Sequence, residues 1–177
     1  LRPGTSRDVA TFTRLINAQY RWLRGEDEWQ QDELAAILIS PTGEPADNDR
    51  YLEVGGQDVG AVHVHIGAPY TKGTVRLALP PGPDRSRYAR TLLEAAERIV
   101  ASNPSTAEHG YLQMDVPRED VELVDVARQQ GFDVAQKVTI LEGDILDAPA
   151  PVWPSEVQVT TFSITRDLED GFTVVSE

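Results

Sequence analysis

Three strand patterns joined by short turns, followed at once by a long helix pattern, constrain the fold more than any other feature of the sequence. Residues 51–54, 59–66 and 74–79 are rich in apolar and β-branched side chains, and Gly55-Gly56 is a hairpin signal between the first two segments. These segments predict an antiparallel meander. Residues 85–101 then carry apolar side chains at helical spacing: Tyr88, Leu92, Leu93, Ala96, Ile99 and Val100. We therefore expect a long amphipathic helix directly after the meander.

The remainder of the chain up to residue 143 predicts further helices and strands. Residues 1–3 indicate the end of a strand, and Ser6 or Asp8 is expected to cap the helix that follows. The other expected elements are a helix over 29–39, a polar loop over 41–49, a turn near Lys72-Gly73, a strand over 111–116, a helix over 119–130 that ends at Gly131, and a strand over 132–141. This order predicts an α/β (α+β) fold whose mixed, mostly antiparallel central sheet has about six to seven strands and is flanked by about four helices.

Composition narrows the classes of function. The 177 residues carry a formal net charge of −13, whereas nucleic-acid binding depends on clustered Lys and Arg that neutralise phosphates. DNA and RNA are therefore not expected partners. Cysteine is absent, which excludes disulfides, thiolate metal sites and a cysteine nucleophile in this sequence. The sequence shows no run of about 18 apolar residues and no charged-then-apolar leader, so we expect a cytoplasmic protein without membrane contact.

A change of character after residue 143 indicates a domain boundary. Residues 144–156 contain three prolines that stiffen the chain and prevent regular pairing, so we interpret them as a linker. Residues 157–164 again resemble a strand, and Thr165-Arg166-Asp167-Leu168 echoes Ser6-Arg7-Asp8-Val9. We predict a first domain over 1–143 and the start of a second, related domain over 157–177. Because the chain begins at Leu1 rather than Met, we expect it to be part of a longer protein.

Two motifs resemble those of the GNAT (Gcn5-related) N-acetyltransferase family. The stretch VRLALPPGPDRSRYARTLL, from Val75 to Leu93, is similar to the family's acetyl-CoA motif, in which a strand ends in a bulge and a loop of pattern (Gln/Arg)-x-x-Gly-x-(Gly/Ala) opens a long helix. Arg128-Gln129-Gln130-Gly131-Phe132 resembles the late helix that ends in Gly-Phe. The order of elements up to residue 143 also matches the family. The resemblance implies the GNAT fold and an acetyl-CoA cofactor.

The resemblance implies a cofactor site where the strand over 74–79 ends and the long helix begins. A helix start leaves N–H groups unpaired and carries partial positive charge, so it can hold a pyrophosphate. The backbone of the splayed strand end would pair with the pantetheine arm, and the first turns of the helix would face the phosphates. The cofactor-binding residues implied are Leu77, Ala78, Leu79, Arg85, Ser86, Arg87, Tyr88, Ala89 and Arg90. The three arginines among them can bind phosphate through guanidinium forks.

Several residues depart from the family pattern. Asp84 stands at the (Gln/Arg) position, where its carboxylate can cap the helix and repel a diphosphate. Arg87 replaces the central Gly, and only the last small position is kept, as Ala89. Ala127 stands where the family often has the Tyr that reprotonates the leaving thiolate, and Asp120 replaces the Asn that usually starts the late helix. We predict that this domain has weakened or lost binding of acetyl-CoA.

The sequence does not identify the catalytic residues, and three side chains are weak candidates. Glu53 lies on the first meander strand, where some family members carry a base, and Asp115 lies near the end of a strand. His63 is a candidate general base because imidazole titrates near neutral pH. We favour the interpretation that His63 and His65 are two polar side chains on a half-exposed strand face. No third ligand lies near them in the sequence, so no metal site is predicted.

Two main hypotheses of function follow. In the first, the full protein is a tandem GNAT enzyme that transfers an acetyl group from acetyl-CoA to a small-molecule amine. This unit is then its degenerate first half, in a layout similar to that of mycothiol synthase, with a second GNAT-like domain in the same chain. In the second, the unit is a non-catalytic pseudo-enzyme module that packs on a partner domain or binds a small effector. An active single domain that uses arginines in place of glycine is a third alternative. The sequence does not decide the oligomeric state, and a homodimer is one alternative that it leaves.

Overall fold

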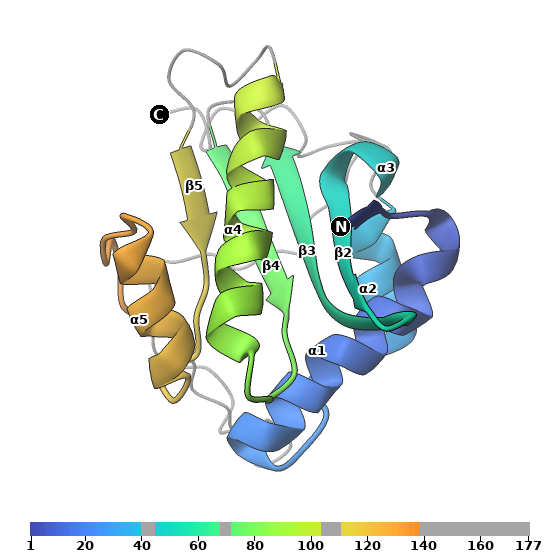
Figure 1. Ribbon diagram of the computed structural model, residues 1–177, viewed down its shortest axis with the longest axis horizontal. Helices are drawn as coiled ribbons and strands as arrows, with labels where there is room; N and C mark the ends of the chain where they lie inside the picture. The colour runs from blue at the N-terminus through green and yellow to red at the C-terminus, as the bar shows by residue number, and fades with distance from the viewer. Residues whose placement is uncertain (40–44, 68–71, 104–110, 139–177) are drawn as a thin grey trace, which may run out of the picture. The chain divides into compact units, whose positions relative to one another are not determined.

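A five-stranded mixed sheet organises the computed structural model, which describes residues 1–39, 45–67, 72–103 and 111–138. The chain divides into two units, Leu1–Ala135 and Gln136–Glu177, and all of the elements below belong to the first. In chain order, as Figure 1 shows, they are β1 (Arg2–Pro3), a 3-10 helix (Ser6–Asp8), α1 (Val9–Arg24), α2 (Gln31–Leu38), α3 (Pro45–Asn48), β2 (Asp49–Val54), β3 (Gln57–Gly67), β4 (Lys72–Ala78), α4 (Arg85–Ser102), β5 (Tyr111–Met114) and α5 (Val121–Gln129).

The strands lie in the order β1-β2-β3-β4-β5. The first four pair antiparallel, whereas β4 and β5 pair parallel, so α4 forms the crossover between them. The turn between β2 and β3 places Gly55 at φ 61° and Gly56 at φ 78°, the left-handed values that a two-residue hairpin turn of type I′ requires. The predicted meander and the mixed, mostly antiparallel sheet are confirmed.

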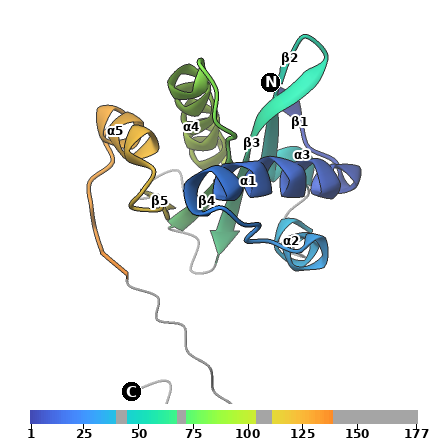
Figure 2. The ribbon, with the colours of Figure 1, turned by 90° about the horizontal axis from the view of Figure 1, so that it is seen from below.

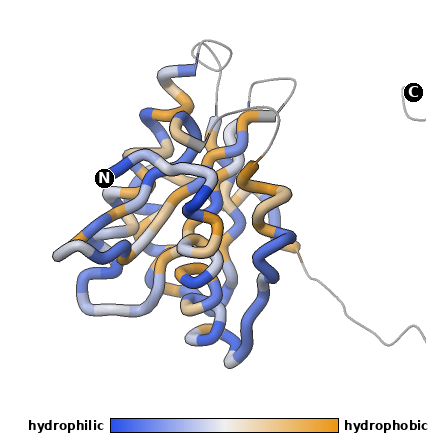
Figure 3. Tube along the Cα trace, turned by 90° about the vertical axis from the view of Figure 1, so that its right-hand side faces the viewer, coloured by the Kyte–Doolittle hydropathy of each residue, from blue (hydrophilic) through white to orange (hydrophobic). Residues whose placement is uncertain are grey.

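Helices cover both faces of the sheet because side chains alternate along each strand. One face packs against α4 and α5, and its buried core contains Val62, Val64, Val75, Leu77, Leu92, Leu93, Ala96, Leu123 and Val126. The opposite face packs against α1 and α2, and its core contains Phe12, Leu15, Ile16, Leu34, Leu38, Tyr51, Ala61 and Ala78. Figure 2 shows α4 and the α1–α2 pair on either side of the strands, and Figure 3 shows hydrophobic and hydrophilic stretches alternating along the chain. The stripe predicted for α4 is buried as expected, apart from the half-buried Tyr88.

Local signals define the helix ends. Asp8 occupies the N-cap position of α1, as one of the two predicted residues, but its side chain makes no capping hydrogen bond there. The side-chain cap lies one turn earlier, where Thr5 is the N-cap of the 3-10 helix. Thr5 and Asp8 form a capping box, in which Oδ2 of Asp8 accepts from the N–H of Thr5 (2.9 Å) and Oγ1 of Thr5 accepts from the N–H of Arg7 (3.3 Å). Gly131 follows α5 with φ 89°, a left-handed value that glycine adopts without steric cost, as the sequence predicted.

The structure corrects four expectations. The polar loop over 41–49 contains the single-turn helix α3, and β2 already begins at Asp49, whereas residues 40–44 lie outside the described ranges. The expected turn at Lys72-Gly73 is the start of β4. Residues 132–138 form no strand, so the described sheet has five strands rather than six or seven. With α3 included, five α-helices are described where about four were expected. The linker over 144–156, the second domain over 157–177 and residues 139–141 lie outside the described residues.

Candidate functional site

The strands β4 and β5 diverge halfway along β4. Their parallel pairing runs from Lys72 opposite Tyr111 to Val75 opposite Met114 and stops there. β4 continues through residues 76–78 paired only with β3 among the described strands. Figure 1 shows α4 beginning just beyond this end of β4. The described geometry therefore has the divergence that the motif around Val75–Leu93 led us to expect, next to the start of the long helix.

A buried polar network occupies this position. The guanidinium of Arg85, in the first turn of α4, donates through Nη1 to Oδ1 (2.7 Å) and through Nη2 to Oδ2 (2.6 Å) of Asp120. Asp120 is the N-cap of α5, where Oδ1 also accepts from the N–H of Leu123 (3.2 Å). The side chain of Arg85 is 1% exposed and that of Asp120 is 0% exposed. This bidentate ion pair therefore joins the starts of α4 and α5 inside the protein.

The same network takes up both backbone groups of Leu79, the residue after β4. The N–H of Leu79 donates to Oε1 of Gln19 on α1 (2.9 Å), and Nε of Arg85 donates to the carbonyl oxygen of Leu79 (3.2 Å). Nε2 of Gln19 in turn donates to Oδ2 of Asp120 (3.2 Å). Leu79 and Gln19 are both buried, and the hydrogen bonds that join Leu79, Gln19, Asp120 and Arg85 form a closed ring. The polar groups that a cofactor arm would need at Leu79 already have partners from the chain.

An aromatic ring and a second carboxylate lie at the outer side of this network. The guanidinium of Arg85 lies 4.9 Å from the ring centre of Trp22 on α1, within the range of a cation–π contact. Nη1 of Arg85 is 3.5 Å from Oε2 of Glu122, and the hydroxyl of Ser86 donates to Oε1 of the same carboxylate. Three carboxylates, those of Asp84, Asp120 and Glu122, thus surround the start of α4, where a pyrophosphate would need positive potential.

Asp84 behaves differently from the expectation that its side chain caps α4. It occupies the N-cap position but makes no capping hydrogen bond. One oxygen instead forms an ion pair with Nη2 of Arg87 at 3.2 Å, and the other accepts from the hydroxyl of Tyr88 at 3.4 Å. The prediction of a side-chain cap is therefore wrong, while the negative charge at the helix start is present as expected.

The other predicted cofactor residues divide into buried and surface positions. Leu77, Ala78 and Ala89 are buried in the two cores. Arg87 has a side chain that is 67% exposed, and Nη2 of Arg90 donates to Oε1 of Gln129 on α5 (2.9 Å). The guanidinium of Arg85 binds Asp120 inside the protein, so of the three predicted arginines only Arg87 and Arg90 have partners at the surface.

The three catalytic candidates do not come together. Glu53 is exposed at the end of β2, after a bulge between Leu52 and Glu53, and Asp115 is exposed just after β5. His63 lies on β3 and is 2% exposed. Glu53 and His63 lie on different strands and Asp115 follows a third, and no catalytic pair forms among them in the described chain.

His63 corrects the expectation of a half-exposed polar face. Its Nδ1 lies 2.6 Å from Oδ1 of Asp49, the residue of β2 that is paired with His63 and is itself buried. Nε2 of His63 is buried without a hydrogen-bond partner among the described residues. On the other side His63 faces Arg76 of β4, whose guanidinium stacks on the ring of Trp29 at 4.4 Å. Burial lowers the pKa of Arg76, and the charges of Tyr20 and Asp115 partly offset that shift.

Sequence reasoning missed Gln19, Asp49 and Arg76. Gln19 was assigned only to the apolar face of the first helix, and Asp49 was placed in a loop. The pairing registers Asp49–His63 and His63–Arg76 supply the signal that shows these side chains are neighbours. No helix within the described ranges has both the length and the apolar character of a membrane span. In the same residues, no three His, Asp or Glu side chains are grouped so that they could hold a metal ion.

Comparisons with known proteins agree on the fold. No protein-family model and no curated protein matches the sequence. Among solved structures, the chain is similar to a GCN5-related N-acetyltransferase from Sphaerobacter thermophilus, with a TM-score of 0.77 and 15% identity over 99% of this chain and 56% of that one. It is also similar to a GNAT-family acetyltransferase from Streptococcus pneumoniae, with a TM-score of 0.57 and 16% identity over 76% of this chain and 84% of that one.

A third similar structure is the diaminobutyrate acetyltransferase of Paenibacillus lautus in complex with L-2,4-diaminobutyric acid and coenzyme A. Its TM-score is 0.55, with 14% identity over 73% of this chain and 72% of that one. The chain therefore has the GNAT acetyltransferase fold that the motifs predicted. It spans little more than half the length of the Sphaerobacter protein.

Proposed function

We propose that this chain supplies a GNAT-like unit that does not itself bind acetyl-CoA, within a protein that transfers an acetyl group from acetyl-CoA to a small-molecule amine. In this proposal the transfer takes place in a second GNAT-like unit that starts near Val157. The single observation that carries the proposal is the buried ion pair between Arg85 and Asp120, together with the bonds from Gln19 and Arg85 to the backbone of Leu79.

The argument is one of competition for the same donors and acceptors. A pantetheine arm that adds to a strand edge needs free backbone groups at the end of β4, and Leu79 has none to offer. A pyrophosphate at the start of α4 would meet the carboxylates of Asp84 and Glu122, which lie on either side of the first turn. Opening the network would leave Asp120 as a buried, unpaired charge, which is strongly unfavourable. At Leu79 the cofactor would therefore have to displace internal hydrogen bonds.

Two features support the location of the chemistry in a second unit. The residues Thr165-Arg166-Asp167-Leu168 repeat the pattern Ser6-Arg7-Asp8-Val9, which in the first unit lies at the start of α1. The chain also spans only 56% of the Sphaerobacter acetyltransferase to which it is similar. The first unit then serves as a structural or regulatory half of the protein.

The test is a titration of the 177-residue chain with acetyl-CoA, in which the melting temperature and the heat of binding are measured. A site with a dissociation constant of about 10 μM would stabilise the folded chain by about 2.7 kcal/mol at about 1 mM ligand. For a protein of this size that stabilisation corresponds to about 5–10 °C in melting temperature. We expect a shift of less than about 1 °C, because the chain's own side chains already bond to the backbone groups of Leu79.

Variants at α4 separate this proposal from an active domain that uses surface arginines. If Arg87 binds the phosphates, the native chain shows the large shift, and Arg87→Gln reduces it while Arg128→Gln on α5 does not. That pair of results would overturn the proposal. The reverse experiment uses Asp84→Asn together with Glu122→Gln, which removes two carboxylates from the start of α4. If acetyl-CoA shifts the melting temperature of this variant by less than about 1 °C too, the buried network itself prevents binding of the cofactor.

A further inference from the structure

A hollow between β2 and α4 lies at the end of α4 opposite the Arg85–Asp120 network. Its volume is about 380 Å³, which falls within the range of small-molecule sites, roughly 300–1,000 Å³. Seven residues from β2, α4 and the start of the chain line it: Leu1, Pro3, Arg50, Ala95, Arg98, Ile99 and Ser102. Arg98 lies thirteen positions after Arg85 on α4, a distance of roughly 20 Å along the axis. This hollow is therefore separate from the Arg85–Asp120 network.

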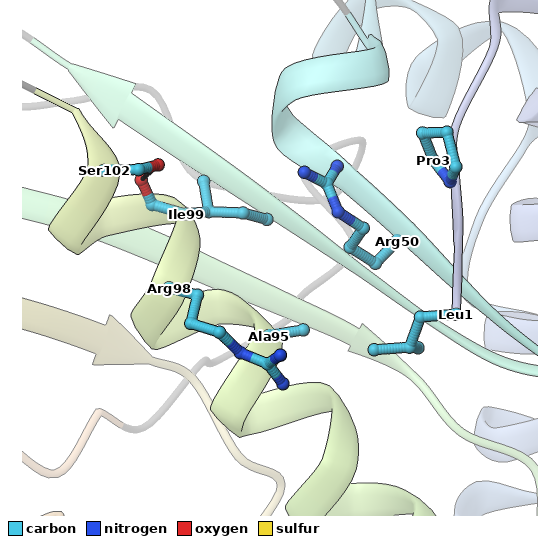
Figure 4. A pocket seen from close by; sticks show the side chains of 7 residues that line it. All are labelled: Leu1, Pro3, Arg50, Ala95, Arg98, Ile99 and Ser102. Carbon is cyan, nitrogen blue, oxygen red and sulfur yellow. Dashed lines mark hydrogen bonds between the residues drawn. The ribbon is translucent and has the colours of Figure 1, made fainter.

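Its two charged residues are both arginines, and they come from facing elements. Figure 4 shows Arg50 on β2 and Arg98 on α4 at the two sides of the hollow, with their guanidinium groups pointing in different directions. The lining residues include no carboxylate, although the whole chain has a formal net charge of −13. A hollow of this kind is a local positive site in an acidic protein, so it selects for an anion.

Arg50 is held in place as a donor. Its Nη1 donates to the backbone carbonyls of Ala46 (2.7 Å), Asp47 (3.3 Å) and Asp49 (2.7 Å). These three bonds hold the guanidinium in one position beside α3. A guanidinium that is already ordered loses less conformational entropy when it binds a carboxylate or phosphate. Arg50 is therefore preorganised for an anion.

Arg98 is a donor with only a weak internal partner. Its Nη2 lies 4.0 Å from Oε2 of Glu94, and the two side chains are 69% and 55% exposed. Exposed pairs of this kind contribute little to stability, so a ligand anion can replace Glu94 at small cost. Nε of Arg98 also donates to the carbonyl of Glu94 at 3.0 Å, which limits the positions of the guanidinium.

The surface between the two arginines is apolar. Ala95 is 4% exposed and Ile99 is 6% exposed, and both belong to the core beneath α4. The hydroxyl of Ser102, at one end, donates to the carbonyl of Ile99 (2.9 Å) and keeps its oxygen lone pairs. An inorganic anion would leave this surface uncovered, whereas an anion with an apolar body would bury it.

We propose that this hollow binds a small organic anion, in which a carboxylate or phosphate group contacts Arg98, Arg50 adds to the positive potential, and an apolar body lies on Ala95 and Ile99. The site is a binding site for an effector or metabolite and takes no part in acyl transfer. It depends on neither the presence nor the absence of acetyl-CoA at the other end of α4. Its failure and the failure of the proposed function are therefore independent results.

The test measures binding to the full chain by calorimetry and by amide chemical shifts. The probes are hexanoate and phenyl phosphate, and the matched controls are hexanol, which is neutral, and inorganic phosphate, which has no apolar body. Arg98→Gln removes the charge but keeps much of the side chain. Arg128→Gln is the control, because Arg128 is also exposed on a helix and pairs weakly with Asp125 at 3.8 Å. Arg50 is left unchanged because it ties α3 to β2 through three carbonyls.

We expect at least one anionic probe to bind and to shift the amide signals of Ala95, Ile99 and Ser102. Loss of a hydrogen bond to a charged group should weaken that binding by roughly tenfold or more in Arg98→Gln. The affinity of Arg128→Gln should stay within about twofold of the native chain, since the control charge is outside the hollow. The comparison of hexanoate with phenyl phosphate then shows which anionic group the site prefers.

Three outcomes would overturn the proposal. The first is that neither anion binds at millimolar concentration. The second is that hexanol or inorganic phosphate alone binds as tightly as the organic anions, since the site would then not recognise both an anionic group and an apolar body. The third is that Arg98→Gln and Arg128→Gln weaken binding equally, which would indicate general attraction to surface charge.

Discussion

Removal of one partner from the ion pair between Arg85 and Asp120 should destabilise the fold far more than removal of a surface pair. Arg85→Leu deletes two charge-assisted bonds of 2.7 and 2.6 Å and the 3.2 Å bond to the Leu79 carbonyl. Asp120 then keeps only the N–H of Leu123 and Nε2 of Gln19, each at 3.2 Å. Breaking a fully buried pair costs about 3–5 kcal/mol, so we expect a loss of about 4 kcal/mol in unfolding free energy.

Asp120→Asn leaves Arg85, rather than Asp120, without its charged partner and should lower the free energy of unfolding somewhat less. The guanidinium of Arg85 still donates to the Leu79 carbonyl and lies 3.5 Å from Glu122, whose side chain is 41% exposed. We expect a loss of about 3 kcal/mol, at the lower end of the same range. The double variant Arg85→Leu/Asp120→Asn no longer contains a buried unpaired charge. It should therefore be more stable than Arg85→Leu alone, which is a strong coupling between the two sites.

Urea unfolding followed by circular dichroism at 222 nm measures these differences, because α1, α4 and α5 all meet at the network. With a slope of about 2 kcal/mol/M, a loss of about 4 kcal/mol lowers the midpoint by about 2 M. The control is Arg128→Leu, which breaks an exposed pair with Asp125 at 3.8 Å and should change stability by no more than about 0.5 kcal/mol. A midpoint for Arg85→Leu equal to that of the control would refute the reasoning, and so would strict additivity in the double variant.

Two further predictions concern the ends of the sheet. Arg2 donates to Asp8 and holds the pKa of that carboxyl below its ordinary value of 3.8. The stability that this ion pair contributes is therefore present above pH 3.8 and is lost as the pH falls through the lower folded-state pKa. Asp8→Asn should flatten the pH dependence of unfolding in that acidic window, measured by urea titration, and an unchanged profile would contradict this prediction. Gly73→Ala would place a Cβ 2.6 Å from Cγ2 of Val100, whereas nothing lies within 4 Å of a Cβ at Gly82. Gly73→Ala should therefore lower the free energy of unfolding by about 1–3 kcal/mol, and the control Gly82→Ala should change it almost not at all. Equal midpoints of urea unfolding for the two variants would show that α4 moves aside freely.

The sequence alone determined the parts of the fold that depend on local pattern. Side-chain alternation and the Gly55-Gly56 turn specify the hairpin of β2 and β3, and apolar spacing specifies α4. Gly131 marks the end of α5 because the chain needs a left-handed residue there. Each of these signals lies within one window of about ten to twenty residues, so it can be recognised without knowledge of what packs against it. The strand expected over 132–141 failed in its described part because apolar composition alone does not supply a pairing partner.

Only the tertiary structure decided how the candidate site is used. Asp120 is 35 positions from Arg85 and 101 positions from Gln19, and nothing local in the sequence relates them. They meet because the crossover through α4 brings the start of α5 beside the end of β4, while α1 packs on the opposite face. The same holds for His63, whose burial against Asp49 follows from strand register. A charge can be read from the sequence, but whether it faces a ligand or another side chain depends on which elements pack against it, and that is set by long-range contacts.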